Sequence, residues 1–151
     1  MQPSSCRLEE LLPHRPPMVL IDEIVGYDLA ARQLTAAVTV RDEWRENWVA
    51  VEFMAQTAAA LAGLFDRESG ARGAARPGFL LGTRKLTLPP EDFTVGRRYL
   101  VTAENVFHDD ESASFACTVR DGEEVVASAV LNAYRPDDLD AFLRQQRGDM
   151  V

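Results

Sequence analysis

The segment Glu46–Asp66, ENWVAVEFMAQTAAALAGLFD, most constrains the fold, because it is one long apolar stretch with strand-like runs on both sides. Its apolar residues predict a helix over about Val49–Phe65. The run is short for a bilayer span, and Glu52 and Gln56 interrupt it. We therefore expect a buried helix that other elements of the fold must cover.

Six runs with strand character flank this helix, two before it and four after it. They cover residues 18–26, 33–41, 79–88, 97–108, 112–120 and 124–134. Gly26 and Asp28 are predicted to bend the chain between the first two runs, and Asp121–Gly122 predicts a tight hairpin between the last two. Since short connections favour antiparallel neighbours, we expect an α+β fold in which a six-stranded antiparallel sheet wraps around one long central helix.

Composition limits the class of protein. A chain of 151 residues fits one domain over residues 1–151, with a core at about 11–136 and a C-terminal surface helix at about 137–147. The formal charge of −8 argues against non-specific binding to nucleic acid or to an anionic membrane. Cys6 and Cys117 have neither disulfide-scaffold nor metal-site spacing, and the first residues do not resemble a signal peptide. We expect a cytoplasmic protein without a metal or other cofactor, with Cys117 as a small core residue.

Two polar residues stand out in the apolar helix. Glu52 and Gln56 are four residues apart, so they share one helix face near the N-terminus, where backbone N–H groups are unpaired and the helix dipole is positive. In a structural interpretation, Glu52 favours the dipole and Gln56 bonds a loop carbonyl. In a catalytic one, Glu52 is a general acid in an apolar pocket. The residues alone leave both interpretations open.

Five sequence segments carry a family resemblance. The helix motif EFMAQTAAALAG resembles the E-A-M-A-Q helix of the 3-hydroxyacyl-acyl carrier protein dehydratases, which are hotdog enzymes of fatty acid synthesis. LLPHRPPMVLIDEIV and TRKLTLPPEDFTVGRRYLVTAENV resemble the strands on either side of that helix, while RPGFLLGTRKL and LNAYRP are more similar to the dehydratase-like proteins of aryl polyene gene clusters. The resemblance covers about residues 11–136. It implies a hotdog fold and a dehydratase that converts a 3-hydroxyacyl thioester on an acyl carrier protein to the 2-enoyl thioester, in fatty acid or polyene-type biosynthesis.

The resemblance also implies roles for residues of the helix. Glu52 matches the family's acid, which pairs with a histidine across a dimer interface, and Gln56 matches the glutamine that orients it. The helix-start N–H groups of Asn47 and Trp48 would polarise the thioester carbonyl. Here the sequence departs from the family, because Glu46 and Asn47 replace its Pro-Gly pair.

The catalytic histidine is a second departure. The family's G-H-F-P histidine lies fourteen residues before the acid, a position that is Val38 in this chain, and no histidine follows before Glu52. Of the two histidines, His108 lies in a polar strand end and is predicted to be a solvated residue. His14 lies among prolines that restrict its loop, and we predict it as the base. A loop histidine that bonds only the backbone is the alternative.

Two further features concern the acyl chain and its carrier. Trp44, Trp48, Phe53 and Phe79 are candidates to line an acyl tunnel, with ordinary core packing as the alternative. Residues 67–98 hold seven basic side chains against three acidic ones, whereas the rest of the chain holds nine against twenty-one. This basic segment is a candidate docking surface for an acidic carrier protein, and a solvated surface is the alternative.

Three functional classes remain. The first is the dehydratase, with Glu52 as acid and His14 as base. The second is a thioesterase of the same fold in which Glu52 activates water. The third is a non-catalytic subunit that binds acyl chains or completes a partner's site, and the missing G-H-F-P motif supports it. For each we expect a homodimer or a heterodimer with a related dehydratase, and neither nucleic acid nor membrane insertion.

Overall fold

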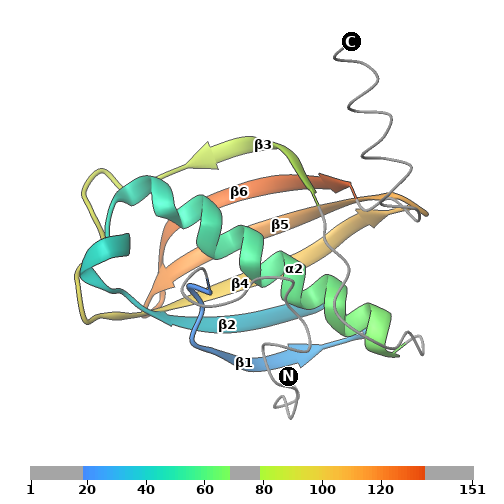
Figure 1. Cartoon of the computed structure of the whole chain (residues 1–151), viewed down its shortest axis with the longest axis horizontal. Helices are drawn as coiled ribbons and strands as arrows, with labels where there is room; N and C mark the ends of the chain where they lie inside the picture. Colours follow the sequence, from blue (N-terminus) through green and yellow to red (C-terminus); the bar gives the residue numbers. More distant parts are fainter. Residues whose placement is uncertain (1–18, 69–78, 135–151) are drawn as a thin grey trace.

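The computed structural model describes residues 19–68 and 79–134, except for the side chains of residues 79–81. Six strands form one antiparallel sheet in the order β1-β2-β4-β5-β6-β3 (Figure 1). The elements in chain order are β1 (Glu23–Asp28), β2 (Gln33–Thr39), the 3-10 turns η1 (Asp42–Trp44) and η2 (Asn47–Val49), α2 (Ala50–Glu68), β3 (Phe79–Thr87), β4 (Arg98–His108), β5 (Ser112–Asp121) and β6 (Glu124–Tyr134). The predicted sheet with one long helix is confirmed.

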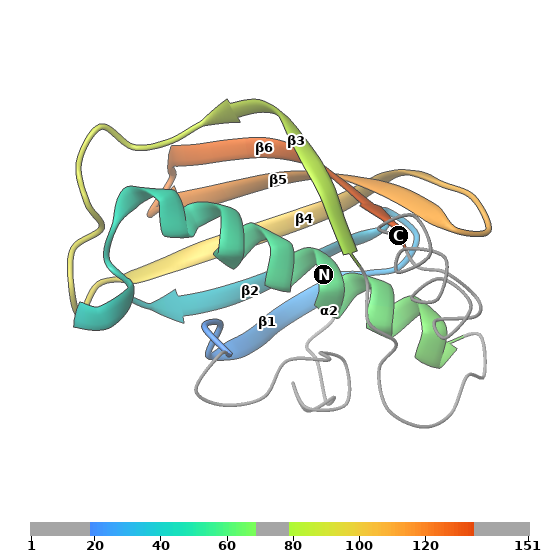
Figure 2. The ribbon, with the colours of Figure 1, turned by 45° about the horizontal axis from the view of Figure 1, so that its top comes forward.

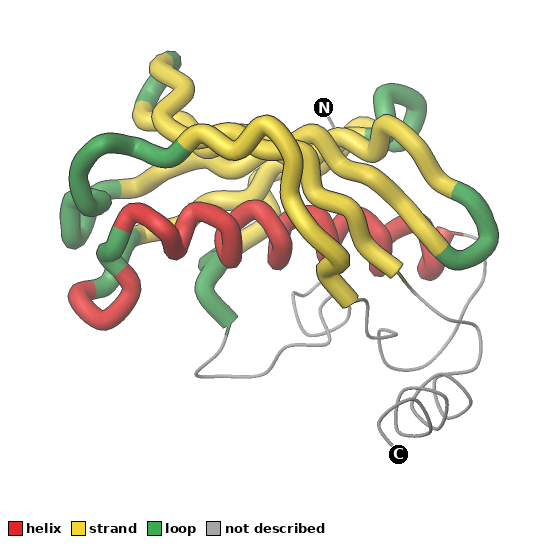
Figure 3. Tube along the Cα trace, turned by 90° about the horizontal axis from the view of Figure 1, so that it is seen from above, coloured by secondary structure: helices red, strands yellow, loops and turns green. Residues whose placement is uncertain are grey.

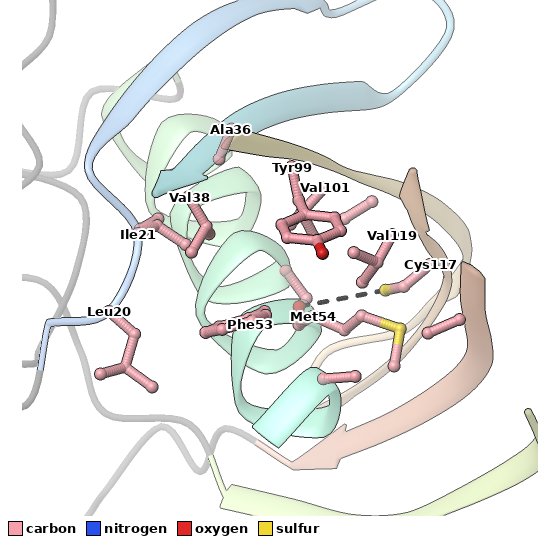
Figure 4. Packing of buried hydrophobic residues seen from close by; sticks show 14 of the residues in the cluster. Leu20, Ile21, Ala36, Val38, Phe53, Met54, Tyr99, Val101, Cys117 and Val119 are labelled. Atoms are coloured by element: carbon pink, nitrogen blue, oxygen red, sulfur yellow. Dashed lines mark hydrogen bonds between the residues drawn. The ribbon is translucent and has the colours of Figure 1, made fainter. Parts of the chain in front are cut away.

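Helix α2 lies across one face of the curved sheet, against β2, β4, β5 and β6 (Figure 3). The Met54 side chain points toward Val119 and Cys117 of β5, and Phe53 lies on the side of the helix toward Leu20 (Figure 4). Both belong to one buried cluster with inward-facing strand residues such as Tyr99 and Val101. Burial of one such large apolar side chain contributes about 1.5–3 kcal/mol. The core therefore consists of one helix face and the inner face of the sheet.

The helix is long and apolar enough to cross a membrane by length and composition alone. Within Asn47–Glu68, an 18-residue window has a mean hydropathy of 1.4, and 61% of that window is buried inside the fold. Its sequence is apolar because it forms the core, as predicted.

The position of β3 differs from the sequence prediction, which made it the antiparallel neighbour of β4. It instead pairs with β6 at the sheet edge, and β4 lies between β2 and β5. The prediction was wrong because the β3–β4 loop, residues 88–97, is not a tight turn and passes the N-terminal end of α2 (Figure 2). Two backbone bonds hold it there, from Phe93 N–H to Arg45 O at 2.8 Å and from Gly96 N–H to Val40 O at 2.8 Å. Gly96 has a φ of 84°, which favours glycine.

The first strand also differs from its predicted bounds. It begins at Glu23 rather than at residue 18, and Leu20 is buried in the core without belonging to a strand. Gly26 lies inside β1 beside a bulge, and the turn follows Asp28. The Asp28 carboxylate accepts the Ala31 N–H at 3.0 Å, so Asp28 does shape the turn while Gly26 does not.

Two smaller predictions are confirmed. Strand β5 ends at Asp121 and β6 begins at Glu124, and Gly122 takes a φ of 61° in the tight connection. Cys117 is a buried core residue, and burial raises the pKa of its thiol to about 12. The predicted C-terminal helix at about 137–147 lies outside the described residues.

Candidate active site

The Gln56 side chain connects Glu52 to the segment that leads into β1. Gln56 is 0% exposed; its Nε2 donates to Glu52 Oε1 at 3.0 Å and its Oε1 accepts the Leu20 N–H at 2.8 Å. Since a backbone N–H can only donate, the amide oxygen must face Leu20 and the amide nitrogen must face Glu52. The orientation of the amide is therefore fixed by the fold, and Glu52 Oε1 is fixed as an acceptor.

This arrangement is compatible with both interpretations of the helix motif, although the backbone partner of Gln56 is the Leu20 N–H and not the loop carbonyl that the structural interpretation expected. A buried amide group that lacks a partner costs about 1–3 kcal/mol, and the bond to Leu20 satisfies one end of Gln56. The other end meets a carboxyl group that is only half-buried. Gln56 thus anchors the lead-in segment and holds Glu52 at the same time.

Glu52 lies on the part of α2 that the sheet does not bury. Val51, Ala55, Ala59 and Ala62 share this half-buried face at helical spacing. One turn before Glu52, Trp48 is 56% exposed.

The start of the helix is fastened to the β3–β4 loop. The Asn47 N–H donates to Asp92 Oδ1 at 3.3 Å, and Asn47 Nδ2 donates to Pro89 O at 3.0 Å. The Asn47 N–H is one of the two groups predicted to polarise the thioester carbonyl, and in this structure it already donates to a carboxylate oxygen. The sequence pattern gave no sign that Asp92 would be that partner.

The described histidine lies far from Glu52. His108 ends β4, is exposed, and places Nδ1 at 3.3 Å from an Arg32 guanidinium nitrogen. That guanidinium lies 4.2 Å from the ring centre of Phe65, thirteen residues after Glu52. Thirteen residues span about 20 Å of helix, so His108 lies at the opposite end of α2. The prediction of a surface residue is confirmed, and His14 lies outside the described residues.

The predicted tunnel residues take different places. Phe53 is 1% exposed in the core, with its ring centre 5.5 Å from that of Phe93. Trp44 is half-buried against the same core, and the side chain of Phe79 is not described. This burial favours core packing, which was the alternative for Phe53. Within residues 19–68 and 79–134, no group of three or more metal-ligating side chains gathers.

Comparison with known families identifies the chain. The family description "ApeP-like: ApeP dehydratase" matches residues 6–144, nearly the whole sequence. The chain belongs to the ApeP-like dehydratase family. The predicted resemblance to aryl-polyene-type dehydratases is thereby confirmed, and the six-stranded sheet with its long helix is the hotdog fold.

Individual relatives agree with this assignment. The curated 3-hydroxyacyl-[acyl-carrier-protein] dehydratase FabZ of Chlamydia pneumoniae is 48% identical over 42 residues, which are 26% of this chain and 28% of that protein. The dehydratase heterocomplex ApeI:P of Xenorhabdus doucetiae superposes with a TM-score of 0.82 at 23% identity, covering 93% of this chain and 97% of that one. An HP0420 homologue of Helicobacter felis gives a TM-score of 0.64 at 9% identity, covering 86% and 88%. The chain is thus a hotdog dehydratase by family, and the FabZ match spans little more than a quarter of that relative.

Proposed function

We propose that this protein removes water from a 3-hydroxyacyl thioester carried on an acyl carrier protein and releases the 2-enoyl thioester. The observation that carries the proposal is the Glu52 carboxyl group, held by the buried Gln56 amide in the first turn of the core helix of an ApeP-like chain. A half-buried carboxyl group with a fixed orientation is suited to proton transfer.

The chemistry requires an acid, a base and a polarised carbonyl. In the proposed reaction, His14 takes the proton from C2 and the electron pair moves toward the thioester carbonyl. The C2=C3 double bond then forms as the C3–O bond breaks, and Glu52 gives the departing hydroxyl the proton that makes it water. Because Glu52 Oε1 accepts from Gln56, the transferred proton belongs on Oε2.

The assignment of the base rests on position along the chain. His108 is at the far end of α2, and residues 39–51 hold no histidine. His14 precedes Leu20 by six residues, and Leu20 is bonded to Gln56 beside Glu52. Six residues span at most about 20 Å, so the tether permits His14 to reach Glu52.

The carbonyl would be polarised by N–H groups at the start of the helix. Asn47 and Trp48 remain the proposed donors, and the helix dipole adds to their effect. Since the Asn47 N–H bonds Asp92 in this structure, a carbonyl oxygen must replace Asp92 to use it.

The carrier would dock on the exposed part of the basic segment. Arg97 pairs with Asp121 at 2.8 Å and Arg98 with Glu23 at 2.8 Å, so these two arginines are partly neutralised. Two other basic residues of the segment, Arg84 and Lys85 of β3, are exposed, and no ion pair with another described residue is found for either. This pair is the proposed contact for an acidic carrier protein.

We expect the protein to be a dimer at micromolar concentration, either of two identical chains or with a related dehydratase. Strand β3 is at the sheet edge, and an edge strand offers unpaired backbone groups to a second chain. The similar ApeI:P structure is a heterocomplex. Sedimentation velocity checks this, first with the purified chain and then after mixing with a related dehydratase. A monomer under both conditions contradicts the expectation.

We further propose one domain and a cytoplasmic location.

The deciding assay supplies the purified chain with a 3-hydroxyacyl thioester on a carrier protein and follows both products by mass. We expect loss of one water from the intact thioester. Release of the free 3-hydroxy acid would instead indicate a thioesterase. If neither product forms with the chain alone or with a dehydratase partner, the protein is a non-catalytic subunit.

A further inference from the structure

We propose that the β3–β4 loop positions Glu52, and that the Asn47 side chain is the positioning residue that joins the loop to the catalytic helix. The inference deepens the proposed function and rests on it. The Asn47 side chain and the loop need not touch the substrate for this role, whereas the Asn47 backbone N–H remains a proposed donor to the thioester carbonyl.

Asn47 holds the loop through its side chain and its backbone at once. Its Nδ2 donates to Pro89 O at 3.0 Å, and its N–H donates to Asp92 Oδ1 at 3.3 Å. From the other direction, the Phe93 N–H donates to Arg45 O at 2.8 Å. Three hydrogen bonds thus join residues 89–93 to the few residues that precede the helix.

The loop itself is anchored in the core by Phe93. This side chain is 4% exposed, and its ring centre lies 5.5 Å from Phe53 and 4.9 Å from Tyr99 in an edge-on arrangement. The Tyr99 hydroxyl accepts the Thr94 N–H at 3.1 Å. The loop is therefore a fixed support for the helix.

These contacts bracket Glu52 along the helix. Asn47 lies five residues before it, and Phe53, which packs on Phe93, comes directly after it. The Glu52 side chain is on the half-buried face, where the sheet does not pack against it. A misplacement of about 1 Å can lower a rate on the order of 10²-fold, so the support at the helix start affects proton transfer.

The tether at the helix start requires a side-chain donor at position 47. A glycine has no side chain to donate to Pro89 O, so the contact depends on asparagine. Asn47 therefore gives the helix start a tether that a glycine cannot provide.

The test compares two variants, one that removes the amide donor at position 47 and one that retains it. Asn47→Asp keeps the size but removes the Nδ2 donor and places a carboxylate near Asp92, whereas Asn47→Gln retains an amide donor. We expect kcat for dehydration to fall on the order of 10-fold to 100-fold in Asn47→Asp with KM changed by less than about 2-fold, and Asn47→Gln to recover part of the loss. Asn47→Ala should resemble Asn47→Asp.

The loop supplies a matched control in the neighbouring acids. Asp92→Ala removes the acceptor of the Asn47 N–H and frees that N–H for the thioester carbonyl, so it tests the backbone N–H as a carbonyl donor separately from the positioning role of the Asn47 side chain. Glu91→Ala makes the same kind of change one residue earlier, at an exposed carboxylate, and should leave kcat unchanged. Rates are compared at a temperature at which circular dichroism shows each variant to be folded.

Two outcomes overturn the inference. One is unchanged kcat in the folded Asn47→Asp and Asn47→Ala variants, and the other is an equal loss in Asn47→Gln and Asn47→Asp. Glu52→Gln, assayed in parallel, separates this failure from failure of the proposed function. If that variant loses activity while the Asn47 variants do not, only the positioning role is wrong.

Discussion

Replacement of Glu52 by glutamine is expected to lower dehydration by about two to four orders of magnitude and to leave the fold intact. Glutamine has nearly the size of glutamate, and its amide oxygen can still accept the Gln56 Nε2 bond. It cannot deliver a proton to the departing hydroxyl. Single-turnover formation of the enoyl thioester measures the loss, and thermal unfolding checks the fold.

The matched control for this variant is a carboxylate on the outer face of the sheet. Glu104 of β4 is half-buried and accepts from Gln33 Nε2 at 3.2 Å, so Glu104→Gln removes one charge from a comparable setting. We expect normal turnover from it. If Glu52→Gln also turned over at a near-normal rate, Glu52 would be only a helix-start acid and the dehydratase mechanism would need another proton donor.

The central helix and its sheet were predictable because they depend on patterns that are local in sequence. A long apolar run at about Val49–Phe65 predicts a buried helix, and the structure has α2 at Ala50–Glu68. Alternating apolar residues likewise predict the strands, since each strand has one face against the helix. The bounds shifted most where no turn residue marks them, at the start of β1.

The position of β3 was not predictable by the same logic. A connection of ten residues, 88–97, looks like a turn between neighbours, and nothing local shows that it passes the helix start. Its path depends on Phe93 entering the core beside Phe53, and these two residues are distant in sequence. Strand order depends on such contacts between distant residues.

The sequence predicted which two side chains of the candidate site lie together, but it did not predict the groups that hold them in place. The four-residue spacing of Glu52 and Gln56 predicts a shared helix face, and the two side chains are hydrogen-bonded. The Leu20 N–H that fixes the amide has no sequence signature, because every residue except proline carries one. Nothing in the sequence distinguishes Asp92 from the other acidic residues, and its contact with Asn47 depends on the path of the loop.

Loss of the His14 side chain is expected to abolish dehydration. If His14 is the base, His14→Ala removes the group that takes the C2 proton, and turnover should fall by about two to four orders of magnitude. Sedimentation should still show the dimer, and binding of the carrier protein should persist, because the proposed contacts for both lie on β3. His108→Ala is the matched control, since it changes the other histidine at the opposite end of α2.

The pattern across the two acid–base variants separates the remaining functional classes. If His14 and Glu52 act together, the double variant should be about as slow as either single one, because groups that act as a unit do not contribute additively.

Full activity in His14→Ala, together with inactive Glu52→Gln, would mean that another group supplies the base. A chain that becomes active only when mixed with a related dehydratase, and is then unaffected by His14→Ala, would take its histidine from the partner. Loss of that mixed activity in Glu52→Gln alone would show that this chain contributes the acid to a shared site.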